Sequence, residues 1–461
     1  MAEPLMTRQL DLFSTFSDQP TNGGFRDPAF AENKSLPIHR WVPWIAGYSA
    51  SFVDDVLAAY IPGNSANYPH RVILDPFAGV GTTLVQAMLR GYQTIGFEIN
   101  PYAALASQVK VHAPFFNLSK LKSLIDAFKE VSSQKLRLSP QQVSSRTPKG
   151  FRTRIPFFST AIEKQVVYIL DFINEIDDKE LSDLFKVAFG SVMVSFSNYT
   201  YEPSLSTRPS AGKPLIVNED VLEIVLKKLR QMVRDIDWVQ ACGNSHSHLS
   251  TTHQVFNVNF MSAAENHLSG LPIDLMITSP PYMNNYHYVR NTRPQLYWLS
   301  LTNAFSSLKQ LEEENFGKFW QNVRTSFPLE PHFTHTKLHL LIQQLRQIRV
   351  EKGAYGGPGW ANYVTTYFND AQRFFSVLKN ILKPGGVGVI VIGNSIIQGI
   401  EFRVDEFFAE LAEKEGLVTE GVRPIRQKRV GASITKSSVR RGQQNGAILY
   451  ESAVIVRKSC G

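Results

Sequence analysis

Cysteine is nearly absent from this chain, and so is any long apolar run. The only cysteines among the 461 residues are Cys242 and Cys460, which excludes a disulfide scaffold and a cysteine-rich zinc module and favours a reducing, cytoplasmic compartment. No apolar run approaches the ~20 residues that span a bilayer. The first residues, MAEPLMTRQLDLF, are not typical of a signal peptide. We therefore expect a cytoplasmic protein that does not insert into a membrane.

Patterns for metals and for two common nucleotide cofactors are also missing. Histidines gather at residues 246–253 and 332–339, but neither group carries a supporting pattern of cysteines or carboxylates, so we expect no metal. The most prominent glycine turn lacks the Lys-Ser/Thr pair of a phosphate-binding loop and the GxGxxG spacing of a dinucleotide fingerprint. Nucleoside triphosphate and NAD are therefore the weaker candidates for its ligand.

That glycine turn is the string DPFAGVGTT, from Asp75 to Thr83. It follows a short apolar run at residues 71–74 and precedes helical spacing at 84–89, so its glycines lie at a strand-to-helix turn whose backbone N–H groups face a ligand. A second predicted strand, 93–99, contains Glu98, whose carboxylate can accept both hydroxyls of a ribose. Together they indicate a nucleoside-like cofactor. The alternative is a plain glycine turn with a surface glutamate.

A second string, TSPPY from Thr278 to Tyr282, ends another apolar run at residues 273–278. Its residues are expected at the carboxyl edge of the sheet, beside the glycine turn. Ser279 Oγ and the Pro280 carbonyl can accept the two N–H groups of an exocyclic amine, and the paired prolines form a stiff wall without donors. Tyr282 offers a ring on which a flipped base can stack. The alternative is a proline-rich turn or a peptide ligand for another domain.

With these residues the chain resembles the S-adenosylmethionine-dependent DNA amino-methyltransferases, and among them the N4-cytosine enzymes, whose catalytic string is SPPY. The resemblance implies the cofactor, the reaction and a seven-stranded, Rossmann-like class I methyltransferase sheet. It implies a catalytic loop of Ser279, Pro280, Pro281 and Tyr282, and a cofactor site of Asp75, Phe77, Ala78, Gly79, Gly81 and Glu98. The stretch 39–52 resembles the segment that packs on the methionine end of the cofactor.

One departure concerns the acidic residue that the family usually offers after the third strand, to hold the adenine amine of the cofactor. Here the sequence reads NFMSAAEN. Ser262 is the expected substitute, with a shifted Glu265 as the alternative.

The pattern of apolar runs predicts an α/β fold independently of the motifs. Seven strand candidates are expected at residues 71–74, 94–98, 254–260, 273–278, 387–392, 417–422 and 448–456. The first five alternate with helical or inserted segments, and the last two are expected to form an antiparallel pair. Helical periodicity is expected at 119–131, 161–175, 179–196, 220–238 and 365–382.

The length of the chain exceeds the ~250–300 residues at which a single core stops growing, so two or three domains are expected. We expect a tail at 1–38, a split catalytic domain at 39–110 and 251–461, and a helical insertion at 111–250 as the candidate target-recognition domain. A second insertion, 283–360, is expected within the catalytic domain. Candidate DNA contacts in the insertions are Arg208, Lys213 and Arg290.

The net charge is +8, and the segment 421–450 holds seven basic residues and no acidic one. It is expected to lie along a DNA phosphate backbone; a solvated charge run is the alternative. The candidate contacts there are Arg426, Arg429, Arg440 and Arg441.

Near the start of the chain, QLDLF from Gln9 to Phe13 resembles the short peptide that binds the bacterial sliding clamp, and packing on its own domain is the alternative. We therefore expect a site-specific cytosine-N4 methyltransferase acting on double-stranded DNA, with this clamp and a cognate restriction endonuclease as candidate partners. Adenine N6 methylation is the alternative reaction; RNA base methylation and non-catalytic DNA binding follow.

Overall fold

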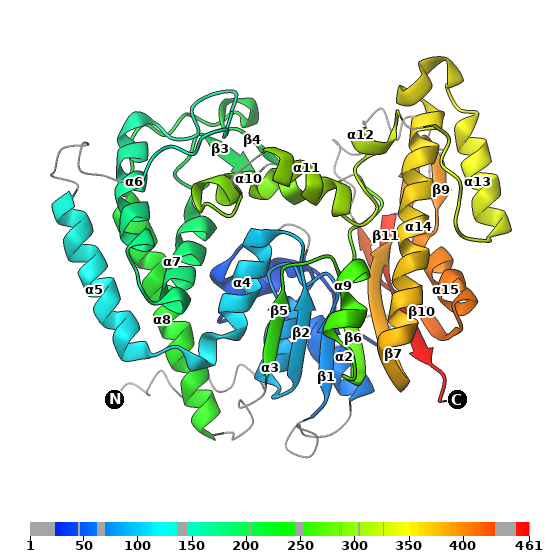
Figure 1. Cartoon of the computed structure of the whole chain (residues 1–461), viewed down its shortest axis with the longest axis horizontal. Helices are drawn as coiled ribbons and strands as arrows, with labels where there is room; N and C mark the ends of the chain where they lie inside the picture. Colours follow the sequence, from blue (N-terminus) through cyan, green and yellow to red (C-terminus); the bar gives the residue numbers. More distant parts are fainter. Residues whose placement is uncertain are drawn as a thin grey trace.

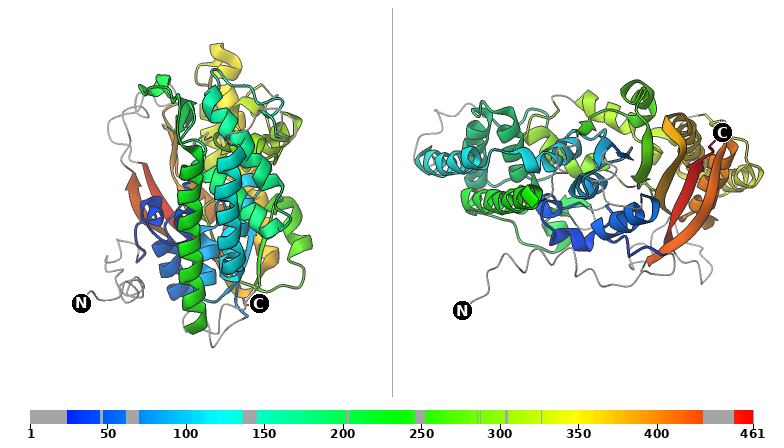
Figure 2. Two further views of the ribbon diagram at one scale, coloured as in Figure 1. Left: turned by 90° about the vertical axis from the view of Figure 1, so that its left-hand side faces the viewer. Right: turned by 90° about the horizontal axis from the view of Figure 1, so that it is seen from below.

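The computed structural model describes residues 24–44, 47–61, 70–135, 145–201, 204–245, 252–284, 286, 288–302, 305–325, 327–428 and 449–460. Figures 1 and 2 show a central sheet with a helical layer at one end and a second group of helices at the other. None of the described helices combines the length and the apolar character needed to cross a membrane.

The central sheet has seven strands in the order β10-β11-β7-β6-β1-β2-β5. Five of them run parallel, and β11 runs antiparallel to both of its neighbours. If the seven strands are renumbered in chain order and the sheet is followed from the β5 edge to the β10 edge, the order is 3-2-1-4-5-7-6. This confirms the predicted class I methyltransferase sheet and the predicted antiparallel final pair. The strands are β1 (Val72–Asp75), β2 (Gln93–Phe97), β5 (His253–Phe256), β6 (Ile273–Thr278), β7 (Leu382–Gly393), β10 (Leu417–Lys428) and β11 (Leu449–Lys458).

The centre of the sheet is covered on both faces, which explains why its strands are continuous apolar runs. Every residue of β1 and β6 is buried. Alternate side chains face opposite layers: Ile73 packs in one core cluster with α2 (Ala50–Tyr60) and α3 (Thr82–Leu89). Leu74 packs in another with α9 (Phe260–His267), α14 (Gly357–Ile381) and α15 (Val404–Lys414).

The helices begin at residues that satisfy their first free N–H groups. Ser49 caps α2, and Asn100 caps α4 (Pro101–Val111) by accepting from the N–H groups of Tyr102 and Ala103, with a proline in the first turn. Helix α14 ends at Ile381, where the sequence LKPGG leads into β7. It begins eight residues earlier than the predicted start at 365, because Trp360, Tyr363 and Val364 are buried on its core face.

Beside β5 and α4 stands the helical layer, drawn in cyan and green in Figure 1. The four predicted helices of this insertion are confirmed as α5 (Leu118–Lys135), α6 (Thr160–Asn174), α7 (Lys179–Val192) and α8 (Val221–Ser245). The other elements are β3 (Tyr199–Tyr201), β4 (Leu205–Thr207), β8 (Ser395–Ile397), β9 (Ile400–Phe402), α10 (Tyr288–Trp298), α11 (Phe305–Glu314), α12 (Trp320–Val323), α13 (Thr336–Arg346), and the 3-10 helices η2 (Phe30–Lys34), η3 (His39–Trp41), η5 (Ala113–Phe115), η7 (Pro209–Ala211) and η8 (Val350–Tyr355).

Asp235 on α8 attaches the segment before α2 to the helical layer. Its side chain is 1% exposed and accepts from the backbone N–H of Ile38 and the indole N–H of Trp41, both at 2.9 Å. It also pairs with the guanidinium of Arg40. A buried carboxylate is tolerated here because several donors, one of them charged, replace its water.

We predict that Asp235→Ala lowers the free energy of unfolding by about 3–5 kcal/mol, because it leaves the buried partners of the carboxylate unsatisfied. Denaturant unfolding followed by circular dichroism measures the loss. Asp237→Ala, an exposed position on the same helix, is the matched control and should stay within about 0.5 kcal/mol of the parent. Equal stability of the two variants would contradict this account of Asp235.

Candidate active site

The glycine turn lies between β1 and α3, at the strand-to-helix position that its sequence predicts. Gly79 and Gly81 have φ angles of 51° and 84°, in the left-handed region that glycine adopts at little cost. A Cβ on Gly81 would lie 2.9 Å from Ser107 Oγ, so α4 packs directly against the turn. A Cβ on Gly79 would lie 3.3 Å from Trp44 Nε1, on the side where a pocket opens.

Asp75, the last residue of β1, joins this turn to the second motif. It is 1% exposed and accepts from Thr278 Oγ1 at 2.6 Å, from the hydroxyl of Tyr48 at 3.0 Å and from the N–H of Phe77 at 3.1 Å. Burial raises the pKa of Asp75, and its hydrogen bonds oppose that shift. Because Thr278 directly precedes Ser279, the two strings are held side by side.

Glu98 follows β2 and faces the glycine turn. Its two carboxylate oxygens accept from the N–H groups of Gly79 and Asn100, each at 2.8 Å. Desolvation raises the pKa of Glu98 to about 7, although these hydrogen bonds oppose the shift. The backbone of Ile99 also contributes a hydrogen bond. Because a carboxylate has about four acceptor sites, Glu98 can still accept from a hydroxyl group of a ligand.

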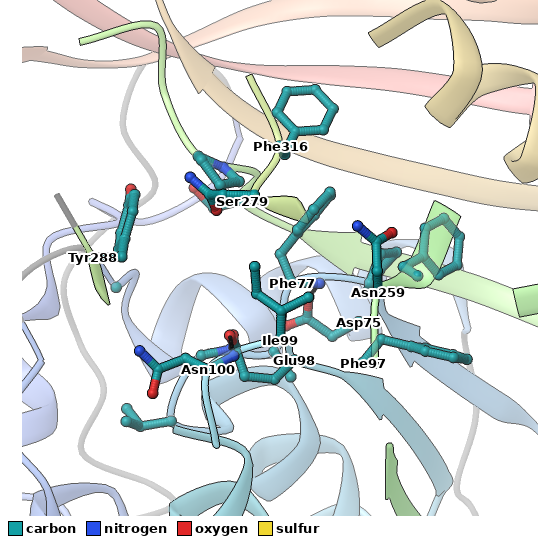
Figure 3. A pocket seen from close by; sticks show the side chains of 18 of the residues that line it. Asp75, Phe77, Phe97, Glu98, Ile99, Asn100, Asn259, Ser279, Tyr288 and Phe316 are labelled. Atoms are coloured by element: carbon teal, nitrogen blue, oxygen red, sulfur yellow. Dashed lines mark hydrogen bonds between the residues drawn. The ribbon is translucent and has the colours of Figure 1, made fainter. Parts of the chain in front are cut away.

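These groups line a first pocket. Figure 3 shows Ser279 and Tyr288 across this pocket from Glu98 and Asn100. It combines apolar walls with a few polar groups, as small-molecule sites do. Of the expected cofactor residues, those that line it are Asp75, Phe77, Ala78, Gly79 and Glu98.

Two expected cofactor residues do not line the pocket. Gly81 is buried against α4 and forms the N-terminal cap of α3, so it shapes the turn from behind. Ser262 is exposed on α9, and its hydroxyl donates to the carbonyl of Asn259. The shifted alternative, Glu265, is also exposed and accepts from Asn380.

Sequence reasoning missed the polar group that does lie at this end of the pocket, Asn259. It caps α9 by accepting from the N–H of Met261, and its amide donates to the carbonyl of Glu314 at 2.7 Å. The position of Asn259 shortly after the third strand of the sheet is the sequence signal that could have identified it. Three other pocket residues of the second insertion had no such signal, because only tertiary packing brings them here: Glu314, Asn315 and Phe316.

The catalytic loop leaves β6 at the same edge of the sheet. The hydroxyl of Tyr367 donates to the carbonyl of Pro281 at 2.9 Å, and that of Ser395 donates to the carbonyl of Met283, so the loop is fixed from α14 and β8. Burial is the main reason that the pKa of Tyr282 lies well above 10; the nearby Glu451 raises this pKa further, and Ser279 lowers it. Pro280, between Ser279 and Tyr282, is buried.

A second pocket adjoins the first, and Ser279 lines both. Trp44, Tyr48 and Tyr288 are also shared. The second pocket is further lined by the aromatic rings of Tyr102, Tyr201, Tyr282 and Tyr286. The serine of the SPPY string therefore lies where the first pocket and the second pocket meet.

The residues expected to contact DNA differ in their exposure and in their partners. Arg290 is exposed on α10. Lys213 is partly exposed, and so is Arg208, whose Nε donates to the carbonyl of Pro214 at 2.7 Å. Arg426 lines the second pocket and lies 3.7 Å from both Glu451 and Asp27. Outside the described residues lie Arg429, Arg440, Arg441 and the tail string from Gln9 to Phe13.

Comparisons with known proteins converge on one enzyme class. Residues 57–108, which contain the glycine turn and Glu98, match the model of a family described as DNA methylase. The Type II methyltransferase M.BsoBI of Geobacillus stearothermophilus is 24% identical, with 88% of this chain and 83% of that protein covered. M.AvaI of Nostoc sp. is 23% identical, with 86% of this chain and 82% of that protein covered. M.MvaI of Kocuria varians is 22% identical, with 75% of this chain and 74% of that protein covered.

The resemblance to the DNA amino-methyltransferases is confirmed. The relatives support a DNA methyltransferase of the restriction-modification type with S-adenosylmethionine as methyl donor, and they do not separate N4 of cytosine from N6 of adenine. The solved structure of the rRNA methyltransferase AviRa of Streptomyces viridochromogenes aligns with 92% of this chain and with 85% of the AviRa chain, at 11% sequence identity and a TM-score of 0.29. Among the described residues, no group of three histidine, cysteine or acidic side chains is placed to hold a metal.

The residues of the first pocket fit this cofactor. The carboxylate of Glu98 suits the two ribose hydroxyls, Phe77 and Phe260 offer apolar faces, and Asn259 supplies a polar group. When bound, S-adenosylmethionine supplies an electrophilic methyl group on its sulfonium.

We predict that affinity for S-adenosylmethionine falls as the pH drops below about 7, the pKa of Glu98, because the protonated carboxyl cannot accept from both hydroxyls. Calorimetric titration between pH 8 and pH 5.5 measures it, with a loss approaching about tenfold per pH unit below that pKa.

Glu98→Gln should weaken binding about 10- to 100-fold, as the loss of charged hydrogen bonds implies, and remove most of this pH dependence. Glu265→Gln, an exposed carboxyl on α9, is the control and should keep the parental profile. A parental pH profile in Glu98→Gln would show that another group titrates.

Proposed function

We propose that this protein transfers a methyl group from S-adenosylmethionine to the N4 amino group of cytosine in double-stranded DNA, as the modification enzyme of a restriction-modification system. The observation that carries the proposal is the position of Ser279, which lines both the first and the second pocket. A group that holds the target amine must face the methyl donor on one side and the base on the other.

The exocyclic amine of a nucleobase is a poor nucleophile, because its lone pair is delocalised into the ring. Ser279 Oγ and the carbonyl of Pro280 accept its two N–H groups and turn the lone pair toward the methyl donor. Tyr367 and Ser395 fix the loop behind them, so this geometry exists before the substrate arrives. Such preorganisation lowers the barrier without a covalent enzyme intermediate.

The aromatic second pocket suits a base that has left the duplex. Enzymes that act on a base within duplex DNA extrude it into a pocket where it stacks on aromatic side chains. The rings of Tyr282, Tyr286 and Tyr288 line this pocket next to Ser279. Serine at the first position of the loop favours cytosine through the resemblance to N4 enzymes, and adenine N6 methylation is the second candidate because the same loop serves both amines.

The insertions and the basic segment supply the remaining contacts in this proposal. Residues 111–250 serve as the target-recognition domain, with Arg208 and Lys213 directed to DNA. The basic segment 421–450 follows the phosphate backbone, and the overall charge of +8 supports such a role. A cognate restriction endonuclease and a sliding clamp bound through Gln9 to Phe13 are the protein partners that we propose.

The reaction itself is tested by incubating the protein with S-adenosylmethionine and unmethylated DNA, followed by digestion to nucleosides and mass spectrometry. We predict N4-methylcytosine. Ser279→Ala should lower the single-turnover rate about 10²–10³-fold, as the loss of one preorganised hydrogen-bond partner does in other enzymes. Ser262→Ala, outside the pocket, is the matched control and should keep the parental rate. N6-methyladenine as product would overturn the assignment of the base.

The role of the basic segment is tested by the salt dependence of DNA binding. Replacing both Arg440 and Arg441 with alanine should weaken binding to all sequences and reduce the slope of log K against log salt by about 0.9 for each phosphate that is no longer neutralised. Fluorescence anisotropy with specific and unrelated duplexes measures this slope. Lys379→Ala, in the last turn of α14 just before β7 begins, is the control. An unchanged slope in the double variant would remove these arginines from the interface.

A further inference from the structure

Arg324, at the end of α12, lies between two aromatic rings. Its guanidinium carbon is 4.7 Å from the centroid of the Trp320 ring and 4.3 Å from the centroid of the Tyr355 ring. Trp320 in turn stacks on Trp360, with centroids 4.8 Å apart and ring planes at 18°. Contacts of this kind hold a guanidinium in place without neutralising its charge.

Among the described residues, no carboxylate compensates this charge. The Nε atom of Arg324 is buried without a hydrogen-bond partner, and the side chain takes part in no ion pair there. Arg293 on α10 provides a contrast, since its guanidinium carbon also lies over two rings, those of Phe151 and Tyr297, at 5.7 Å each. Burial raises the pKa of Glu312 and the charge of Arg293 opposes that shift, so a carboxylate lies near Arg293. An uncompensated guanidinium such as that of Arg324 favours an anionic ligand.

The first turn of α14 lies against the same arginine. A Cβ on Gly359 would be 3.1 Å from Arg324 Cβ, so glycine at this position allows the close approach. The N-terminal end of a helix carries a partial positive charge, and no side chain caps α14. Because this partial charge and the guanidinium repel each other, their proximity is unfavourable unless an anion lies beside them.

Two further cations come from the turn that carries Tyr355. Arg349 directly precedes η8, Lys352 lies within it, and both are exposed. Residues 315–355 contain six basic and two acidic residues, so this part of the second insertion has a net positive charge. We call the surface formed by Arg324, Arg349, Lys352 and Tyr355 the η8 surface.

The η8 surface lies at the same edge of the sheet as the catalytic loop. Helix α14 ends where β7 begins, and β7 runs parallel to β6, so α14 begins at the carboxyl edge of these strands. Both α12 and η8 pack on α14, and Figure 1 shows α12 beside its upper part. Tyr367, which donates to the carbonyl of Pro281, lies about 15 Å along the helix axis from the first residue, Gly357.

We propose that the η8 surface binds the phosphate backbone of the DNA substrate a few base pairs from the target base. This deepens the proposed function and rests on DNA being the substrate. Because B-DNA advances about 3.4 Å per base pair, a distance of about 15 Å corresponds to about four base pairs. A guanidinium binds phosphate through two parallel hydrogen bonds, and the rings of Trp320 and Tyr355 fix its plane beforehand. Such a contact positions the duplex without reading its sequence.

The test is the salt dependence of duplex binding by the full chain, measured by fluorescence anisotropy with two labelled duplexes of unrelated sequence. Arg324→Gln should weaken binding to both duplexes about tenfold, as the loss of a charged hydrogen bond implies. It should also reduce the slope of log K against log salt by about 0.9, the value for one phosphate. Replacing Arg349 and Lys352 with glutamine should reduce the slope further.

Two other variants separate a phosphate contact from a packing role. Arg293→Gln removes an arginine that also lies over two rings, and it should keep the parental slope. Arg324→Lys keeps the charge but not the planar group, so it should retain most of the slope that Arg324→Gln loses. The affinity for S-adenosylmethionine, measured by calorimetry, should match that of the parent in every variant.

An unchanged slope in Arg324→Gln would overturn the proposed role of the η8 surface. So would an equal loss of slope in Arg324→Lys and Arg324→Gln, because Arg324 would then act through its packing on the two rings. A parent that binds duplexes with the expected slope but methylates none of them would contradict the proposed function and leave the η8 surface standing.

Discussion

The arrangement of the whole site depends on the hydrogen bond between Asp75 and Thr278. These residues end two adjacent parallel strands whose register pairs Leu74 with Met276, so the side chains of Asp75 and Thr278 meet at 2.6 Å. The glycine turn begins one residue after Asp75, and the catalytic loop begins one residue after Thr278. A single buried hydrogen bond thus fixes the distance between the glycine turn and the SPPY loop.

Burying Asp75 has a cost that the surrounding residues offset. Its raised pKa reflects desolvation, and three donors compensate for the missing water: Thr278, Tyr48 and the N–H of Phe77. Tyr48 also contacts Thr83 at the start of α3 and the carbonyl of Ile277. The segment before α2 therefore reaches both motifs through one hydroxyl, which explains why the stretch 39–52 belongs to the site although it carries no chemistry of its own.

The sequence predicted those parts of the site that are local. Apolar runs located all seven strands, because buried parallel strands need continuous hydrophobic side chains, but β7 begins at Leu382 and not at the predicted 387, and β10 continues to Lys428 and not to the predicted 422. The two motifs located the edge where the pockets lie. What it did not predict depends on distant packing. Glu451 comes from β11, far along the chain from Tyr282, and Asn259 lies where an acidic residue was expected. Ser262 has the right residue type, but helix geometry turns it to solvent.

The choice between cytosine and adenine also depends on residues that distant packing brings together, and not on the local motifs. In the proposed reaction, Ser279 and Pro280 contact only the amine, which both bases carry, so these two residues do not distinguish one ring from the other. Discrimination must come from groups that contact the rest of the base, in the walls of the second pocket. Gln295 on α10 is such a group: it is 5% exposed, its Nε2 donates to Gly190 and Tyr201, and its Oε1 has no hydrogen-bond partner among the described residues. An unsatisfied buried oxygen costs about 1–3 kcal/mol, which a base that reaches it with a donor would recover. In the proposed function, residues of the insertions therefore select the base, and the SPPY loop holds only its amine.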